Sequence, residues 1–167
     1  GMGPLGNGIN GVALGAPPVP DPGNGFASHN FVGGTQPGDR NVISGNLNSG
    51  VWIDDGTDNH VLGNYIGVGV DGKTPLGNGK ATNTAQFGKH GVFIQGGTNN
   101  FIGGTDAGSG NVISGNSGDG VHIDATDSDT AGNHVQGNMI GVDKDGNFGV
   151  GLGNVEGVKI RNTSTVG

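Results

Sequence analysis

Short apolar stretches with an alternating pattern recur along the chain. In Val51-Trp52-Ile53, Val92-Phe93-Ile94, Val121-His122-Ile123 and Val158-Lys159-Ile160, aliphatic residues hold the first and third positions, while the middle residue varies. Successive side chains of a β-strand point to opposite faces, so the aliphatic pair is predicted to face a narrow interior and the middle residue to face solvent. Strands this short do not build a sandwich, and the chain lacks the helical period needed for crossover helices.

An internal repeat organises these stretches. The segment Asn41-Val42-Ile43-Ser44-Gly45-Asn46 recurs unchanged at 111–116, an offset of 70 residues, and 50–54 answers 120–124 at the same offset. Further on, 59–68 answers 133–142 at an offset of 74, because the Asp-rich loop between them is longer. Self-similarity of this kind predicts a stacked repeat architecture.

The spacing of the strand starts predicts a coil. Gly-Val pairs begin strands at Gly11, Gly50, Gly91, Gly120 and Gly157, which are 39, 41, 29 and 37 residues apart. We therefore expect a parallel β-helix of about four turns, in which the 70-residue repeat spans two turns. Residues 3–167 are expected to form one domain, with repeat one at 5–75, repeat two at 76–151 and a partial third repeat at 152–167. Gly1 and Met2 are expected to be a tag remnant or a start, and the chain a fragment of a longer protein.

Gly-Asn pairs mark the predicted corners. Gly accepts a positive φ freely and Asn tolerates it better than most residues. Side chains at equivalent corners of coils about 4.8 Å apart can form a hydrogen-bonded ladder along the axis. We expect a structural ladder from Asn46, Asn64, Asn116 and Asn138; the alternative is that these residues only cap loops.

The motifs Asn-Val-Ile-Ser-Gly-Asn, Gly-Asn-Tyr-Ile-Gly and Leu-Gly-Asn resemble the parallel β-helix repeats of large bacterial surface and secreted proteins. The resemblance covers nearly the whole chain and implies an all-β, right-handed parallel β-helix solenoid with Gly- and Asn-rich corners, located outside the cell or at its surface. It implies little about function, since similar coils serve in polysaccharide lyases, glycoside hydrolases, phage tailspikes and adhesin-like stalks.

Composition narrows the function classes. The chain has 40 Gly among 167 residues, 31% hydrophobic residues, a formal charge of −7 and no Cys. The chain has only seven Lys and Arg residues, which is few positive charges for neutralising phosphate groups. Nucleic acid and acidic membranes are therefore not expected as partners. No apolar run is long enough for membrane insertion. We expect a non-catalytic structural or adhesive segment with weak carbohydrate binding; the alternative is a fragment of a polysaccharide lyase or glycoside hydrolase whose active site is incomplete or lies outside the chain.

The middle positions of the strands give the candidate ligand-binding surface. Trp52, Phe93 and His122 are predicted to form one outward column with Lys159. Exposed aromatic residues on a flat sheet can stack on sugar rings or pack against a partner, so polysaccharide or another surface protein is the expected partner. Coverage of the column by a loop, from Ala81–Lys89 or Ala16–Pro22, is the alternative.

Acidic residues give the remaining candidates. Asp54 and Asp124 each follow a strand, two turns apart, which corresponds to roughly 9.6 Å, close to the spacing of an inverting hydrolase. The alternative is that Asp54 and Asp124 are solvated residues at the ends of their strands, without a catalytic role. The Asp-rich turns at 54–58, 124–129 and 143–147 could hold Ca²⁺, but such turns also form without an ion. No catalytic constellation and no metal site is predicted, His60 and His134 are expected to pack, and open coil ends are expected to allow end-to-end self-association.

Overall fold

The computed structural model describes residues 6–15, 27–80, 88–125 and 130–161, in which the chain is all-β apart from one turn of 3₁₀ helix at Pro37–Asp39. The strands form three parallel sheets. The first sheet holds β1 (Val12–Leu14), β4 (Val51–Asp54), β7 (Val92–Gln95), β10 (Val121–Asp124) and β13 (Val158–Arg161). The second holds β2 (Phe31–Gly33), β5 (His60–Leu62), β8 (Phe101–Gly103) and β11 (His134–Gln136), and the third holds β3 (Val42–Ile43), β6 (Tyr65–Ile66), β9 (Val112–Ile113) and β12 (Met139–Ile140).

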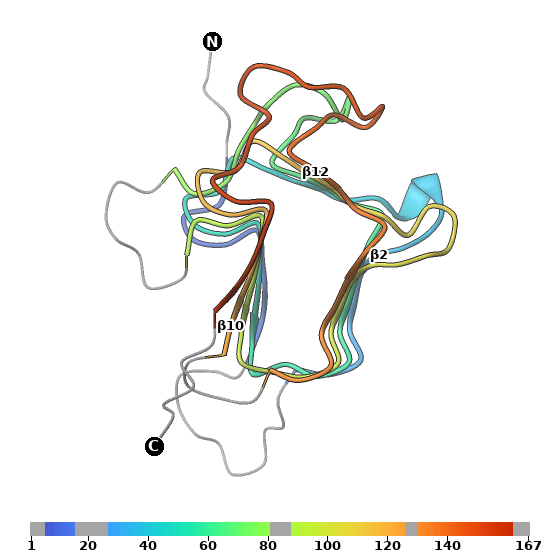
Figure 1. Cartoon of the computed structure of the whole chain (residues 1–167), viewed down its shortest axis with the longest axis vertical. Coiled ribbons are helices and arrows are strands. Elements are labelled where there is room, and N and C mark those ends of the chain that lie inside the picture. Colours follow the sequence, from blue (N-terminus) through green and yellow to red (C-terminus); the bar gives the residue numbers. More distant parts are fainter. Residues whose placement is uncertain (1–5, 16–26, 81–87, 126–129, 162–167) are drawn as a thin grey trace.

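The chain visits the three sheets in a fixed rotation. One strand of the first sheet is followed by one of the second and one of the third, and we call each such round a coil. Each strand pairs with its equivalent in the next coil, and successive coils overlie one another in the view of Figure 1. The predicted register of the Gly-Val starts is confirmed, and parallel sheets in this order fit a β-helix or solenoid.

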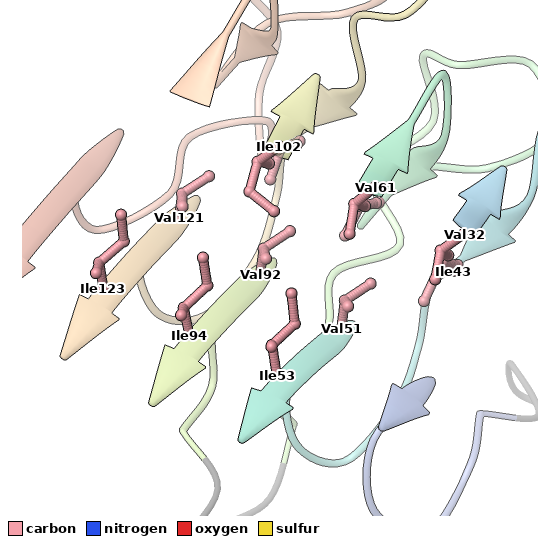
Figure 2. Close-up of a cluster of buried hydrophobic side chains, with 12 residues drawn as sticks. Val32, Ile43, Val51, Ile53, Val61, Val92, Ile94, Ile102, Val121 and Ile123 are labelled. Atoms are coloured by element: carbon pink, nitrogen blue, oxygen red, sulfur yellow. The ribbon is translucent and has the colours of Figure 1, made fainter. Parts of the chain in front are cut away.

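The aliphatic positions of the strands form the core between the sheets. The pattern predicted for the first and third residues of each strand is confirmed in β4, β7 and β10, whose Val and Ile side chains are at most 4% exposed. Figure 2 shows side chains from different sheets pointing into the same interior. The core cluster contains Val32, Ile43, Val51, Ile53, Val61, Ile66, Val92, Ile94, Ile102, Ile113, Val121 and Ile123.

Asparagine ladders run along all three corners. One contains Asn7, Asn46, Asn78, Asn116 and Asn154; the second contains Asn41, Asn64, Asn111 and Asn138; the third contains Asn30, Asn59, Asn100 and Asn133. The ladder predicted from Asn46, Asn64, Asn116 and Asn138 is confirmed, although these four residues belong to two ladders instead of one. The glycines that precede these four residues, Gly45, Gly63, Gly115 and Gly137, have positive φ values of 65–75°.

The position of the middle residues differs from the expectation. Phe93 and His122 are only 6% and 8% exposed, so the predicted solvent exposure is wrong for these two side chains. Trp52 and Lys159 are half-buried. Among the described residues, no helix has the length and apolarity to cross a membrane.

Candidate functional site

The outer face of the first sheet carries the predicted column. Pairing of β4, β7, β10 and β13 places Trp52, Phe93, His122 and Lys159 opposite one another in successive strands. The ring of His90, which precedes β7, lies over this column, 5.2 Å from Phe93 and 4.3 Å from His122 between ring centroids. His90, which directly follows the predicted loop 81–89, therefore covers part of the face, whereas residues 16–22 and 81–87 of the two loops expected to cover it lie outside the described residues.

Three polar side chains meet on this face. The residues before the glycines that start β7 and β10 are His90 and Asp119, and β10 itself carries His122. The Asp119 Oδ2 atom lies 2.7 Å from Nδ1 of His122 and 3.3 Å from Nδ1 of His90. The side chains are 15%, 5% and 10% exposed for His90, Asp119 and His122, so the cluster is largely shielded from water.

Burial sets the protonation of His90. Desolvation, with the nearby His122 as the second cause, lowers the pKa of His90 to about 4, so this imidazole is neutral at pH 7. Its Nδ1 accepts a hydrogen bond of 3.0 Å from the backbone N–H of Asp119. The His122 Nδ1 lies within hydrogen-bond distance of the Asp119 carboxylate, which favours the tautomer protonated at Nδ1. Among the described residues, the buried Nε2 of His122 has no hydrogen-bond partner.

The next coil has an ion pair at the positions equivalent to Asp119 and His122. Glu156 and Lys159 occupy the positions equivalent to Asp119 and His122, and their charged groups lie 3.1 Å apart at the surface. The buried cluster differs because a second imidazole approaches the carboxylate. Two imidazoles and a carboxylate could hold a metal ion or act as a shielded polar network.

The two acidic residues predicted as a pair lie at equivalent positions of β4 and β10, with β7 between them. Asp54 and Asp124 both lie opposite Gln95, which separates them by one strand, so about 9.6 Å divides the two backbone positions. Burial, with the charge of Asp55 as a second cause, raises the pKa of Asp54. The pairing thus supports the predicted separation and places an amide side chain between the two acids.

The acidic turn at 143–147 uses its carboxylate internally. Oδ1 of Asp143 accepts 2.8 Å hydrogen bonds from the backbone N–H groups of Asp145 and Asn147. These bonds lower the pKa of Asp143 and account for an aspartate here without an ion. In the turn at 54–58, Asp55 and Asp58 adopt positive φ values of 50° and 52°. The turn at 124–129 lies mostly outside the described residues.

A second aromatic column was not predicted. Phe31, His60, Phe101 and His134 stack along the outer face of the second sheet, with centroids 4.6–4.8 Å apart and planes within 7° of parallel. The packing role predicted for His60 and His134 fits this stack. Neighbouring rings cover most of the ring faces, so the column offers sugars mainly ring edges, except at its two ends, where Phe31 is 68% exposed and His134 is also exposed.

A groove of about 530 Å³ opens beside the third sheet and was also missed. Its lining includes Arg40, Tyr65, Asn111, Met139 and Lys144. The Arg40 guanidinium lies 4.3 Å from the centre of the Tyr65 ring and donates a 2.9 Å hydrogen bond to the Gly63 carbonyl. Tyr65 and Asn111 are at most 7% exposed, so the side chains that the groove presents are mainly the exposed Arg40, Met139 and Lys144.

Comparison with known proteins adds no assignment: no family model, curated protein or solved structure matches the chain.

Proposed function

We propose that the chain is a segment of about four turns of a right-handed parallel β-helix, serving as a non-catalytic structural or adhesive element of a secreted or cell-surface protein. The observation that carries the proposal is the set of three continuous Asn ladders. The buried polar side chains of the corners make their hydrogen bonds to equivalent residues of neighbouring coils, which extends the coil and provides no reactive group.

The direction of the ladders supports a role in extension. In each rung, the backbone N–H of the earlier Asn donates to Oδ1 of the later one, and in every rung except Asn7–Asn46 its Nδ2 does so too, as from Asn78 to Asn116 at 3.2 and 2.9 Å. Every ladder has this same polarity, so the two ends of the stack differ chemically. A further coil, or a second copy of the chain, would continue the ladders only in a head-to-tail arrangement. Light scattering over a concentration series tests this self-association; a monomer at every concentration would contradict it.

Weak carbohydrate binding is a second candidate function, favoured by the Arg40–Tyr65 groove. The exposed cations Arg40 and Lys144 in its lining are suited to the acidic groups of polysaccharides. We expect an oligosaccharide array to show binding that is weakened by Arg40→Ala. Trp52→Ala is the matched variant in the column on the first sheet. If this variant alone loses binding, the carbohydrate site lies on that column and not in the groove.

The enzymatic alternative requires a separate test. Incubation with uronate and neutral polysaccharides, followed by assays for unsaturated products and reducing ends, is expected to show no turnover. Product formation that is lost in Asp54→Asn or Asp124→Asn would overturn the non-catalytic proposal and favour a hydrolase or lyase fragment.

A further inference from the structure

We propose that His90, Asp119 and His122 form a binding site for a divalent transition metal, for which Zn²⁺ is the reference ion. Each residue offers a donor atom, and these atoms all lie within 4.8 Å of one another. Two imidazoles and one carboxylate are donors that Zn²⁺ takes in proteins, with a fourth position left to a water molecule.

Two of the donor separations can be compared with those around a bound ion. Donors arranged tetrahedrally at zinc bond lengths of about 2.0–2.1 Å lie roughly 3.3 Å apart. Oδ2 of Asp119 is already 3.3 Å from Nδ1 of His90, and it is 2.7 Å from Nδ1 of His122. Binding replaces the proton shared by His122 and Asp119, and these two donors separate by about half an ångström. It also replaces the hydrogen bond from the Asp119 amide to His90, which limits the affinity.

The second ring nitrogen of His122 lies outside the proposed donor set. The His122 side chain is 10% exposed, and its Nε2 atom has no hydrogen-bond partner in the described part of the chain. Because Nδ1 is the proposed donor, Nε2 does not contact the ion, and a water molecule is the common explanation for such a nitrogen.

The surroundings hold the donors in place. A Cβ atom on Gly88 or Gly118 would lie 2.5 or 2.9 Å from the ring of His90, so only glycine at these positions lets the ring occupy its place. His122 lies in β10, and Asp119 lies two residues before that strand begins. β10 is an interior strand of the first sheet, paired with β7 and β13. A preformed donor set loses less entropy on binding than a mobile one.

The neighbouring coils provide a comparison within the chain. Ser49 and Trp52 stand where the later repeat has Asp119 and His122, and the following coil has Glu156 and Lys159. Neither set combines two imidazoles with a carboxylate, so the site is expected once per chain. If Asp119 and His122 were only an ion pair like Glu156 and Lys159, the protein would show no response to metal.

Titration calorimetry with ZnCl₂ on metal-stripped protein tests the proposal, and Co²⁺ absorption reports the coordination. We expect one equivalent of Zn²⁺, a visible Co²⁺ band and a higher melting temperature with either ion. Asp119→Asn, which keeps the shape of the side chain, and His122→Phe, which introduces the residue found one strand away, should each weaken binding at least about 100-fold.

The control is His60→Phe, which should retain full affinity because Phe31 and Phe101 occupy the equivalent positions of its column. Circular dichroism checks that each variant is folded; Asp119→Asn decides the outcome if His122→Phe is not. Absence of heat and of a Co²⁺ band in the unmodified protein would overturn the proposal. Equal affinity in the folded variants, or equal loss in His60→Phe, would do the same by indicating scattered surface sites.

Discussion

Replacing Asn78 with alanine tests whether the ladders stabilise the fold. Asn78 is fully buried in the middle of its ladder. Its Oδ1 accepts hydrogen bonds from the backbone N–H and Nδ2 of Asn46, at 3.2 and 2.8 Å. Its Nδ2 donates to the Ile43 carbonyl at 3.0 Å and to Oδ1 of Asn116 at 2.9 Å. Truncation removes all four hydrogen bonds of the side chain.

The expected cost follows from the atoms left behind. Asn46 N–H, Asn46 Nδ2 and the Ile43 carbonyl lose this partner in a buried region, whereas Asn116 Oδ1 keeps the backbone N–H of residue 78. Each unsatisfied buried group costs about 1–3 kcal/mol. Water can enter the polar space that the side chain leaves and recover part of this loss. We therefore expect Asn78→Ala to lower the free energy of unfolding by about 3 kcal/mol, at the lower end of the sum over the three groups.

Urea unfolding followed by circular dichroism measures this change. The matched control is Asn7→Ala, in the same ladder, where the side chain is exposed and the rung is made by the backbone N–H, which the variant retains. This control should stay within about 0.5 kcal/mol of the parent. A loss of less than about 1 kcal/mol in Asn78→Ala, or equal losses in the two variants, would refute the structural role of the ladder.

Three further predictions follow from the corners, the buried histidine and the aromatic stack. Gly63 has a φ of +69° and an added Cβ would collide with the Gly34 carbonyl, so Gly63→Ala should cost more than about 1 kcal/mol in urea unfolding, whereas Gly8→Ala, with open space, should cost less. His90 has a folded pKa of about 4 against about 6.5 unfolded, so its neutral state favours folding above pH 6.5; as the pH falls, the unfolded state binds the proton first, and up to about 3 kcal/mol should be lost by pH 4. Urea unfolding across this range with EDTA present should show a shallower fall for His90→Gln, and an unchanged profile would contradict the assignment. Phe101→Ala interrupts the stack between two histidines and should cost more than about 1 kcal/mol, while His60→Phe should be nearly neutral; equal melting temperatures would argue against a stabilising stack.

The register of the first sheet could be predicted because its signal repeats in the sequence. A Gly-Val start followed by alternating aliphatic residues gives each coil the same marker, and the pairing of Val12, Val51, Val92, Val121 and Val158 follows from it. The Gly-Asn corners were readable for the same reason. Both features depend on local residue types that are conserved from coil to coil within this chain.

The third ladder and the aromatic stack were not predicted, because the 70-residue repeat aligns a residue with its equivalent two coils later and not with the one in the next coil. Compared coil by coil, an asparagine precedes each strand of the second sheet and an aromatic residue follows it directly, as in Asn30-Phe31, Asn59-His60, Asn100-Phe101 and Asn133-His134. Successive pairs are 29, 41 and 33 residues apart (30 to 59, 59 to 100, 100 to 133) because the loops between them differ in length. Irregular loops therefore obscured a signal that was present.

The His90–Asp119–His122 cluster was missed for a different reason. Its members are 29 and 3 residues apart, and they meet because His90 and Asp119 occupy the same place before successive Gly-Val starts. The alternating pattern predicted that the middle residue of each strand faces solvent, so His122 was expected to be exposed. The covering contact with His90 depends on tertiary packing that strand periodicity does not encode.

The two repeats share the residues that build the coil and differ on its outer face. Inward aliphatic residues and ladder asparagines recur, because a change there leaves a cavity or an unpaired buried polar group. The outer positions differ between the repeats, and there Ser49 and Trp52 give way to Asp119 and His122. Introducing Asp and His at 49 and 52 would still not duplicate the cluster, because Asn10 stands one coil earlier in the position that corresponds to His90. A specific activity of this chain is therefore best sought where the repeats diverge.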